Sequence, residues 1–189
     1  MKQFLVKLRS KTPYMAHRMD DQKLEDWEKN RKLIIESPDV AKEDALRAEF
    51  HSYSDEEGFF IPSEHIRGSL INAGAMVKSK VGNSRKSMKN IVAAMFFIKE
   101  EKIRLPKEYE IDKRSAVNRN IKARVICIRP KWKEWKGEFT LQVDNDTITK
   151  ETVEQIIIYA GQYIGIGSFR PTNNGMFGRF ELLSIKEIK

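Results

Sequence analysis

The sequence predicts an α+β domain in which helices cover one face of an antiparallel sheet. The chain has 189 residues, of which 40% are apolar, and this size suits a single domain with a substantial core. Several short segments alternate apolar and polar residues with a period of two, as strands do. Between them, other segments carry apolar residues at helical spacing.

The first half of the chain is expected to contain two strands, a helix and an acidic insertion. Residues 2–10 alternate as a first strand, and residues 14–57 form an acidic, mainly helical insertion with one helix over about 20–36 and another after Pro38. Residues 58–62 are apolar and predict a short buried strand that ends at Pro62. Ser63 then begins a helix that runs to about Val77.

The second half is expected to contain a loop, four strands and a helix. Residues 78–89 are interpreted as a basic loop, and the apolar run 91–98 as a strand buried on both faces. Residues 121–128 and 138–143 predict two antiparallel partner strands joined by a turn at 129–137. Thr149 is expected to cap a helix with Val153 and Ile156 on its inner side, and residues 177–185 to form the last strand.

Without the insertion, this order of elements matches the split βαβ pattern of a ferredoxin-like domain. We therefore predict one α+β domain over residues 1–189, with a ferredoxin-like antiparallel sheet, helices on one face, and the acidic insertion after the first strand.

Composition excludes several classes of protein. The single cysteine, Cys127, cannot form an internal disulfide, and the three histidines at 17, 51 and 65 lack metal-ligand spacing, so neither a metal nor a cofactor is expected. The amino terminus lacks the apolar run of a signal peptide. Because no segment approaches the roughly 20 apolar residues that cross a bilayer, no membrane partner is expected, and the cytoplasm is the predicted compartment.

Charge is distributed unevenly along the chain. Residues 19–57 hold thirteen acids and six bases, a net of −7, and since the whole chain carries +8, the remainder carries +15. Acidic residues are absent from 65–99, from 113–133 and from 155–180. Ordinary surfaces mix both signs, so we expect these three windows to meet on one surface that faces phosphates. The alternative is that they are separate solvated faces.

Nine basic residues in these windows are candidates for contacts with nucleic-acid phosphates: Lys78, Lys80, Arg85, Lys86, Lys89, Arg114, Arg119, Arg170 and Arg179. Trp132 and Trp135 alternate with lysines, a pattern that suits stacking on the bases of a single strand; they could instead close over the edge of the core. No RRM consensus motif is present, which favours recognition of the backbone over base reading.

A glycine-rich segment, residues 161–182, carries Gly165, Gly167, Gly175 and Gly178. It is not a dinucleotide fingerprint, because a predicted helix precedes it and a strand follows it. Glycines let a backbone approach a sugar-phosphate closely, and we expect that role here. The alternative is a turn that needs glycine for its own packing.

Two segments resemble a known family. FFIPSEHIRGSL (59–70) is similar to the "IPGSSLKGALR" signature of the RAMP superfamily, which includes backbone subunits of CRISPR effector complexes. GIGSFRPTNNGMFGRFEL (165–182) resembles the glycine-rich loop and last strand with which RAMP proteins end, and it is also similar to small stand-alone phage proteins. The match departs from the signature at Ser63, Glu64 and His65.

The resemblance implies a modified RRM-like fold that binds single-stranded RNA or DNA, often as a row of subunits in which an insertion, here 14–57, reaches the neighbour. We therefore expect a noncatalytic protein that binds the nucleic-acid backbone and assembles as a homo-oligomer or within a nucleoprotein complex.

Two alternatives stay open. The chain could be a metal-independent endoribonuclease, with His17, His65, Asp20 or Asp21 as general acid or base. It could also be a protein adaptor or inhibitor that mimics a CRISPR effector subunit and docks through its acidic insertion.

Overall fold

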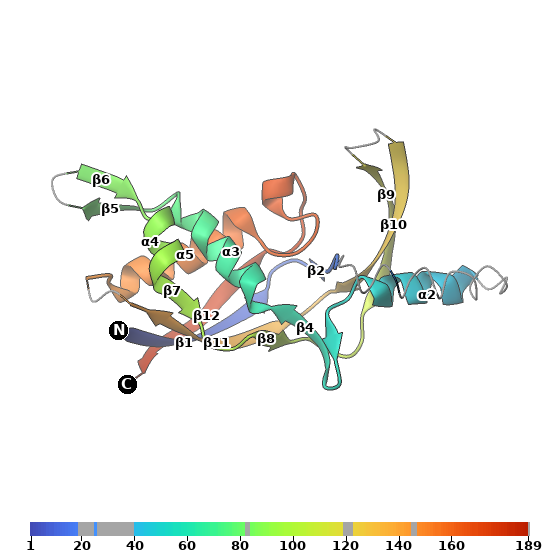
Figure 1. Ribbon diagram of the computed structural model, residues 1–189, viewed down its shortest axis with the longest axis horizontal. Helices are drawn as coiled ribbons and strands as arrows, with labels where there is room; N and C mark the ends of the chain where they lie inside the picture. Colours follow the sequence, from blue (N-terminus) through green and yellow to red (C-terminus); the bar gives the residue numbers. More distant parts are fainter. Residues whose placement is uncertain (19–24, 26–39, 82–83, 119–122, 145–146, 189) are drawn as a thin grey trace.

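A four-stranded antiparallel sheet forms the body of the protein (Figure 1). The computed structural model describes residues 1–18, 25, 40–81, 84–118, 123–144 and 147–188. The strands are β1 (Lys2–Ser10), β7 (Phe96–Ile98), β11 (Lys136–Val143) and β12 (Phe180–Ile188), in the order β12-β1-β11-β7.

This strand order is that of two interleaved split βαβ units. Strands β1 and β7 both pair antiparallel with β11, which lies between them, so they are parallel to each other. Strands β11 and β12 flank β1 in the same way. Helices separate the strands of each unit in the sequence, which confirms the predicted α+β class and the ferredoxin-like arrangement.

The helices α3 (Ser63–Gly74), α4 (Lys89–Met95) and α5 (Lys150–Tyr159) lie over one face of this sheet (Figure 1). Strand β1 alternates as predicted and buries Phe4, Val6 and Leu8 in the core that also contains Leu70 of α3 and Ile156 of α5. Thr149 caps α5, as predicted, because its hydroxyl accepts a hydrogen bond from the Thr152 backbone N–H. The predicted starts of α3 and of the last strand are also confirmed within a few residues.

A hairpin of β9 (Glu110–Asn118) and β10 (Ala123–Trp132) stands away from the body, and we call it the arm (Figure 1). Strand β2 (Tyr14–Met15) pairs with the base of β10. Helix α2 (Val40–Phe50) lies against the arm, where Lys113 Nζ is 2.8 Å from Asp44 Oδ2. The other face of the arm contacts the glycine-rich segment.

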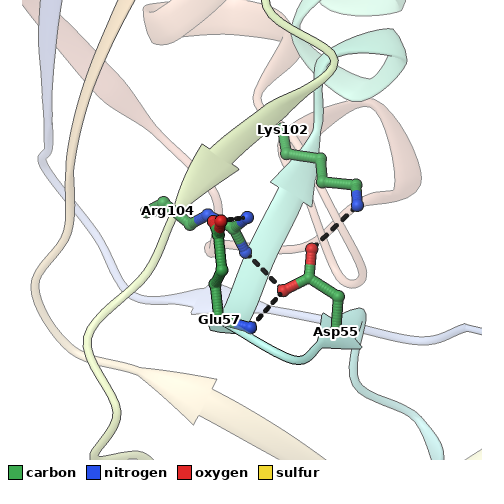
Figure 2. A network of polar contacts seen from close by, with 4 residues as sticks. All are labelled: Asp55, Glu57, Lys102 and Arg104. Atoms are coloured by element: carbon green, nitrogen blue, oxygen red, sulfur yellow. Dashed lines mark hydrogen bonds and ion pairs between the residues drawn. The ribbon is translucent and has the colours of Figure 1, made fainter.

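A smaller sheet joins β3 (Ser54–Asp55), β4 (Gly58–Pro62) and β8 (Lys102–Arg104). Figure 2 shows the ion pairs that hold the β3–β4 turn to β8. Asp55 accepts hydrogen bonds from Lys102 at 2.8 Å and Arg104 at 2.6 Å, and Arg104 also pairs with Glu57. The Arg104 and Lys102 side chains hold the pKa of Asp55 far below its usual range.

The predicted strand over 91–98 is wrong in its first half, where the structure has helix α4 and only Phe96–Ile98 extend as β7. A short apolar run suits a buried strand and a buried helix equally. Two alanines favour the helix, and Val92 packs closely on Gly74 of α3, where a Cβ would lie 2.9 Å from the valine methyl.

Two further predictions need correction. The expected loop at 78–89 contains a hairpin of β5 (Lys78–Val81) and β6 (Ser84–Ser87). The strands expected over 121–128 and 138–143 do not pair with each other: β10 pairs with β9 and β2, whereas β11 pairs with β1 and β7. Pairing depends on which edges are available in the assembled fold, and an alternating pattern does not specify it.

The segment predicted as an acidic insertion is described in part. The helix expected over 20–36 lies outside the described residues apart from Glu25, while α2 covers Val40–Phe50. At the start of the segment, Tyr14 and Met15 are fully buried. These two residues therefore belong to the core of the body. In the described residues, no helix has both the length and the apolar character needed to cross a membrane.

Candidate nucleic-acid interface

Helix α3 and the glycine-rich loop enclose a cleft of about 410 Å³, which we call the histidine cleft. Its walls are α3 residues between Glu64 and Asn72, loop residues between Ile164 and Asn173, and the side chains of His17 and Tyr53. The two segments that resemble the RAMP signatures therefore face each other across one hollow.

The loop owes its shape to backbone conformations that favour glycine. One turn of π-helix (Ala160–Ile164) extends α5 and ends at the loop. At Gly167, φ is +73° and a Cβ would lie 2.6 Å from the Met15 carbonyl oxygen; at Gly178, φ is +71° and a Cβ would lie 1.8 Å from the Ile166 carbonyl oxygen. Such contacts leave no room for a side chain. The packing of the loop itself therefore requires these glycines. This agrees with the alternative that the segment is a turn that needs glycine for its own packing.

Two of the four predicted loop glycines also line the cleft. These are Gly165 and Gly167, whereas Gly175 packs against Phe169 and Gly178 against Ile166. Phe169 itself has φ of +55°, which is unusual for a bulky residue. The first two glycines form part of the cleft wall, and the last two hold the loop in place. Close approach of a ligand backbone at Gly165 and Gly167 stays a prediction.

All three histidines of the chain gather at this cleft. His17 and His65 line it, and His51 stacks on His17 with ring centroids 4.6 Å apart. Arg129 links the group to the loop, since its Nε donates to His17 Nδ1 at 2.9 Å and its Nη1 donates to Ser168 Oγ at 3.0 Å.

These hydrogen bonds determine where the imidazole protons lie. Because an arginine can only donate, the neutral His17 accepts at Nδ1 and carries its proton on Nε2. His51 is the reverse: Nδ1 is 3.0 Å from the Arg18 carbonyl oxygen and must donate to it. His65 Nδ1 is 3.4 Å from the Tyr14 hydroxyl, a contact that either tautomer allows.

The environment keeps all three imidazoles neutral at pH 7. Burial lowers the pKa of His17 to about 4, and the positive charge of Arg129 adds to this shift. Burial also lowers the pKa of His51 and that of His65, and Arg170 contributes at His65. Burial raises the pKa of Tyr14, which therefore keeps its proton.

Arg170 supplies positive charge within the cleft. Its Nη1 donates to the Gly167 carbonyl at 2.9 Å and its Nε to Thr172 Oγ1 at 3.0 Å, so the side chain is held against the loop. Glu64 is the one carboxylate among the described lining residues. The cleft thus combines a cation, neutral imidazoles and exposed loop backbone, a combination that suits an anion with sugar-like neighbours.

Five of the predicted phosphate contacts lie elsewhere. Lys78, Lys80, Arg85 and Lys86 are on the β5–β6 hairpin and Lys89 begins α4, all beyond the carboxyl-terminal end of α3 (Figure 1). The wall of the cleft on α3 runs from Glu64 to Asn72, and none of the five predicted contacts between Lys78 and Lys89 is among the described residues that line it. Two of the three basic windows meet at the cleft, because Arg129 contacts His17 and Ser168, and Arg170 lines the wall.

The remaining predicted cations have varied surroundings. Arg114 is engaged within the chain: it forms a bidentate pair with Asp112, and its guanidinium lies 5.2 Å from the Phe169 ring centroid and 5.0 Å from that of Phe177. Arg119 lies outside the described residues. Arg179 is exposed beside Thr12, at the outer side of the glycine-rich loop.

The predicted stacking role of Trp132 and Trp135 is wrong. The two side chains are 1% and 2% exposed and belong to the hydrophobic core. Trp132 donates to the Pro106 carbonyl and packs against Tyr14 and Phe59, so its ring faces are covered. Burial of these large rings stabilises the core, in agreement with the alternative that they close over its edge.

Sequence reasoning missed His51 and Arg129 as members of the site. Arg129 lies in a basic window but was not among the predicted contacts, and His51 lies in the acidic segment. Only the fold brings them to His17, and no spacing pattern indicates this. Within the described ranges, no group of three or more histidine, cysteine or acidic side chains is placed to hold a metal ion.

Comparison with known proteins identifies no family. Neither a protein-family model nor a curated protein matches the sequence. Among solved structures, the chain is similar to a chain of a Cas6 product complex, with a TM-score of 0.36 and 12% identity over 95% of this chain and 50% of that one. This protein thus spans about half the length of the chain it matches, and a score this low carries no argument about function.

Proposed function

We propose that this protein binds single-stranded RNA or DNA through its sugar-phosphate backbone and that the histidine cleft is the binding site. The observation that carries the proposal is the hydrogen bond from Arg129 to His17 Nδ1, which leaves Nε2–H as a neutral donor at a cleft that also holds Arg170. Phosphate oxygens accept hydrogen bonds from such donors while the imidazole stays neutral.

Recognition of the backbone is favoured over recognition of bases. The two tryptophans that could have stacked on bases lie in the core, and the cleft offers glycines and polar side chains in their place. The net charge of +8 supports binding to a polyanion.

A noncatalytic role is favoured by the tautomer of His17. A general base needs a free lone pair facing the substrate, but the His17 lone pair is on Nδ1 and accepts from Arg129. His17 can donate a hydrogen bond from Nε2 and cannot remove a proton there.

The proposal is tested by fluorescence anisotropy of labelled single-stranded RNA, single-stranded DNA and duplex DNA over a range of salt. We expect single strands to bind, with affinity falling steeply as salt rises. Arg170→Ala should weaken binding about tenfold or more and reduce the salt slope by about 0.7, the value for one phosphate contact. The affinity of Arg170→Lys should lie between those of the wild type and Arg170→Ala, because lysine keeps the positive charge but lacks the several N–H donors of the guanidinium.

The matched control is Lys186→Ala, an exposed lysine on β12, which should bind like the wild type. Equal losses in both variants would contradict a site at the cleft. If no nucleic acid binds to the wild type while a pull-down recovers protein partners, the adaptor alternative replaces this proposal.

A second candidate, a metal-independent endoribonuclease, is supported by His65. Its imidazole lines the cleft, is neutral, and contacts the hydroxyl of Tyr14. Incubation of labelled RNA with the wild type, His65→Gln and His17→Asn separates the two functions. Intact RNA in the wild-type sample supports simple binding, and cleavage that is lost in His65→Gln supports the enzyme. Asp20 and Asp21 lie outside the described residues.

A further inference from the structure

A second hollow lies on the other side of the glycine-rich loop, and we call it the lysine groove. It measures about 990 Å³ and is formed by the end of β1 with residues 11–13, by the end of β8 with Pro106, by residues 133–136 and by Glu181. Five of its lining residues are basic and two are acidic. No predicted phosphate contact lies in its wall.

Three of the five bases are neutralised within the chain. Arg9 pairs with Glu181, Arg104 with Asp55 and Glu57, and Lys133 with Glu110. The other two are Lys11 and Lys136, which are exposed and form no ion pair within the part of the chain that the structure describes. Their charge is available to an anion from outside.

One buried donor beside the groove also lacks an acceptor within the described residues. Trp135 lines the groove, and its Nε1 is buried and has no hydrogen-bond partner among the described residues. Such donors are uncommon in folded proteins, because each one loses its bond to water without a replacement.

The groove and the histidine cleft are joined by a short series of backbone hydrogen bonds. Ile166 of the cleft donates to the Gly178 carbonyl, and Gly178 donates to the Pro13 carbonyl. The next residue, Arg179, accepts from Lys11 and Thr12 of the groove, and its backbone N–H donates to Thr12 Oγ1. The backbone of Arg179 therefore lies between the two hollows, and its side chain is exposed.

We propose that the strand bound in the histidine cleft continues past Arg179 into the lysine groove, where Lys11 and Lys136 contact further phosphates. This inference rests on the proposed function and adds a second subsite, so the bound strand is longer than the cleft alone would hold. The ligand class is the same in both hollows, a sugar-phosphate backbone. Basic side chains contact its phosphates, and the bases are not contacted.

The test compares a strand of about four nucleotides with one of about sixteen. For the wild type, affinity should rise with length. Lys11→Glu/Lys136→Glu should lose at least about tenfold for the longer strand and little for the shorter one. The matched control, Lys99→Glu/Lys186→Glu, changes the net charge equally at two exposed lysines outside both hollows. It should keep the length dependence of the wild type.

Each outcome is decisive. If both double variants bind the longer strand equally, the second subsite does not exist, although the cleft can still be the site. If the groove variant loses the shorter strand as strongly as the longer one, the strand does not run from cleft to groove. If the wild type binds neither strand, the proposed function itself fails. Thermal melting of each variant verifies that the fold is intact.

Discussion

At the scale of single residues, His17 is held by contacts within the fold and carries the Nε2–H that we propose donates to a phosphate. Its imidazole is stacked on His51 and accepts from Arg129, and it stays neutral because desolvation of the ring and the positive charge of Arg129 both lower its pKa. The folded protein therefore resists adding a proton that the unfolded chain accepts freely.

This difference predicts how stability depends on pH. The pKa of His17 falls from 6.5 in the unfolded chain to about 4 in the fold, so between these values the unfolded state binds more protons. The contribution of His17 to the free energy of unfolding is complete above about pH 6.5 and is lost as the pH falls towards 4. We expect His17→Asn, which keeps an acceptor for Arg129, to flatten this part of the profile. Urea unfolding across this pH range measures it; an unchanged slope would contradict the assigned environment.

Two glycine substitutions separate stability from binding. Gly68 lies in α3 and lines the cleft, and a Cβ there would meet nothing within 4 Å. Gly68→Ala should raise stability by about 0.5–1 kcal/mol through helix propensity, and weaken strand binding if the backbone approaches α3. Gly178→Ala should lower both the stability of the fold and the affinity for the strand, and backbone strain alone should cost about 1–3 kcal/mol of stability. Thermal melting and anisotropy on the two variants report these effects, and undiminished binding by Gly68→Ala would place the strand away from α3.

At the scale of elements, the arm supports the glycine-rich loop. Arg114 of β9 is held by the buried Asp112 and contacts the rings of Phe169 and Phe177. Phe169 has a positive φ, and a side chain in that conformation needs surrounding contacts to hold it. The arm therefore positions one wall of the histidine cleft.

We expect Arg114→Lys to loosen the loop without unfolding the body. Lysine keeps the charge but loses the bidentate pair and the planar contact with the rings, a contact worth about 0.5–2 kcal/mol. Amide hydrogen exchange of residues 165–178 should speed up, and strand affinity should fall. Lys113→Ala is the control, because Lys113 pairs with Asp44 on the opposite face of the arm. Equal protection of the loop in Arg114→Lys and the wild type would disprove this support.

The ion network at the β3–β4 turn makes a separate prediction (Figure 2). Arg104 and Lys102 lower the pKa of Asp55, so the ionised carboxylate stabilises the fold above its usual pKa of 3.8, and this contribution is lost as the pH falls below that value. Asp55→Asn should lower the melting temperature slightly at low salt, and the difference from the wild type should shrink at high salt because the pairs are exposed. A difference that is independent of salt would show that charge is not the cause.

The elements differ in how far the sequence could predict them. Strand β1 and helix α5 carry clear periodicity and, at Thr149, a capping residue, and both were predicted from local patterns. The pairing of β10 with β9, and the helix at Lys89–Met95, depend on contacts with distant segments.

The histidine cleft depends on such contacts as well. Arg170 was found because it lies inside a recognisable loop, whereas Arg129 and His51 carry no local signal and reach His17 only through the fold.

At the scale of the whole molecule, the positive charge is distributed over three features, whereas the sequence predicts that the three acid-free windows form one surface. The β5–β6 hairpin, the histidine cleft and the lysine groove each hold cations, and the cleft and the groove lie on either side of one loop. The hairpin follows the carboxyl-terminal end of α3, and none of its described residues lines the cleft or the groove. We therefore expect it to meet another part of a long strand or a neighbouring subunit.

Assembly of several copies on one strand stays a prediction. It is based on the net negative charge of residues 19–57 and the net positive charge of the rest of the chain. We expect several copies to bind one long strand and to separate at high salt, because opposite charges attract between subunits. Light scattering coupled to chromatography, with a strand of about 40 nucleotides, should report a mass of more than one chain per strand. A strict one-to-one complex would contradict assembly.

The most direct test of the binding site uses the fact that the three histidines all lie at the cleft. In a protein labelled at histidine, the three imidazole signals are followed by NMR while single-stranded RNA is added. A phosphate beside His17 and His65 favours their charged forms, so both signals should shift and saturate with the strand, and the pKa of each should rise. Unshifted imidazole signals, in a sample where anisotropy shows the strand to be bound, would place the binding site elsewhere.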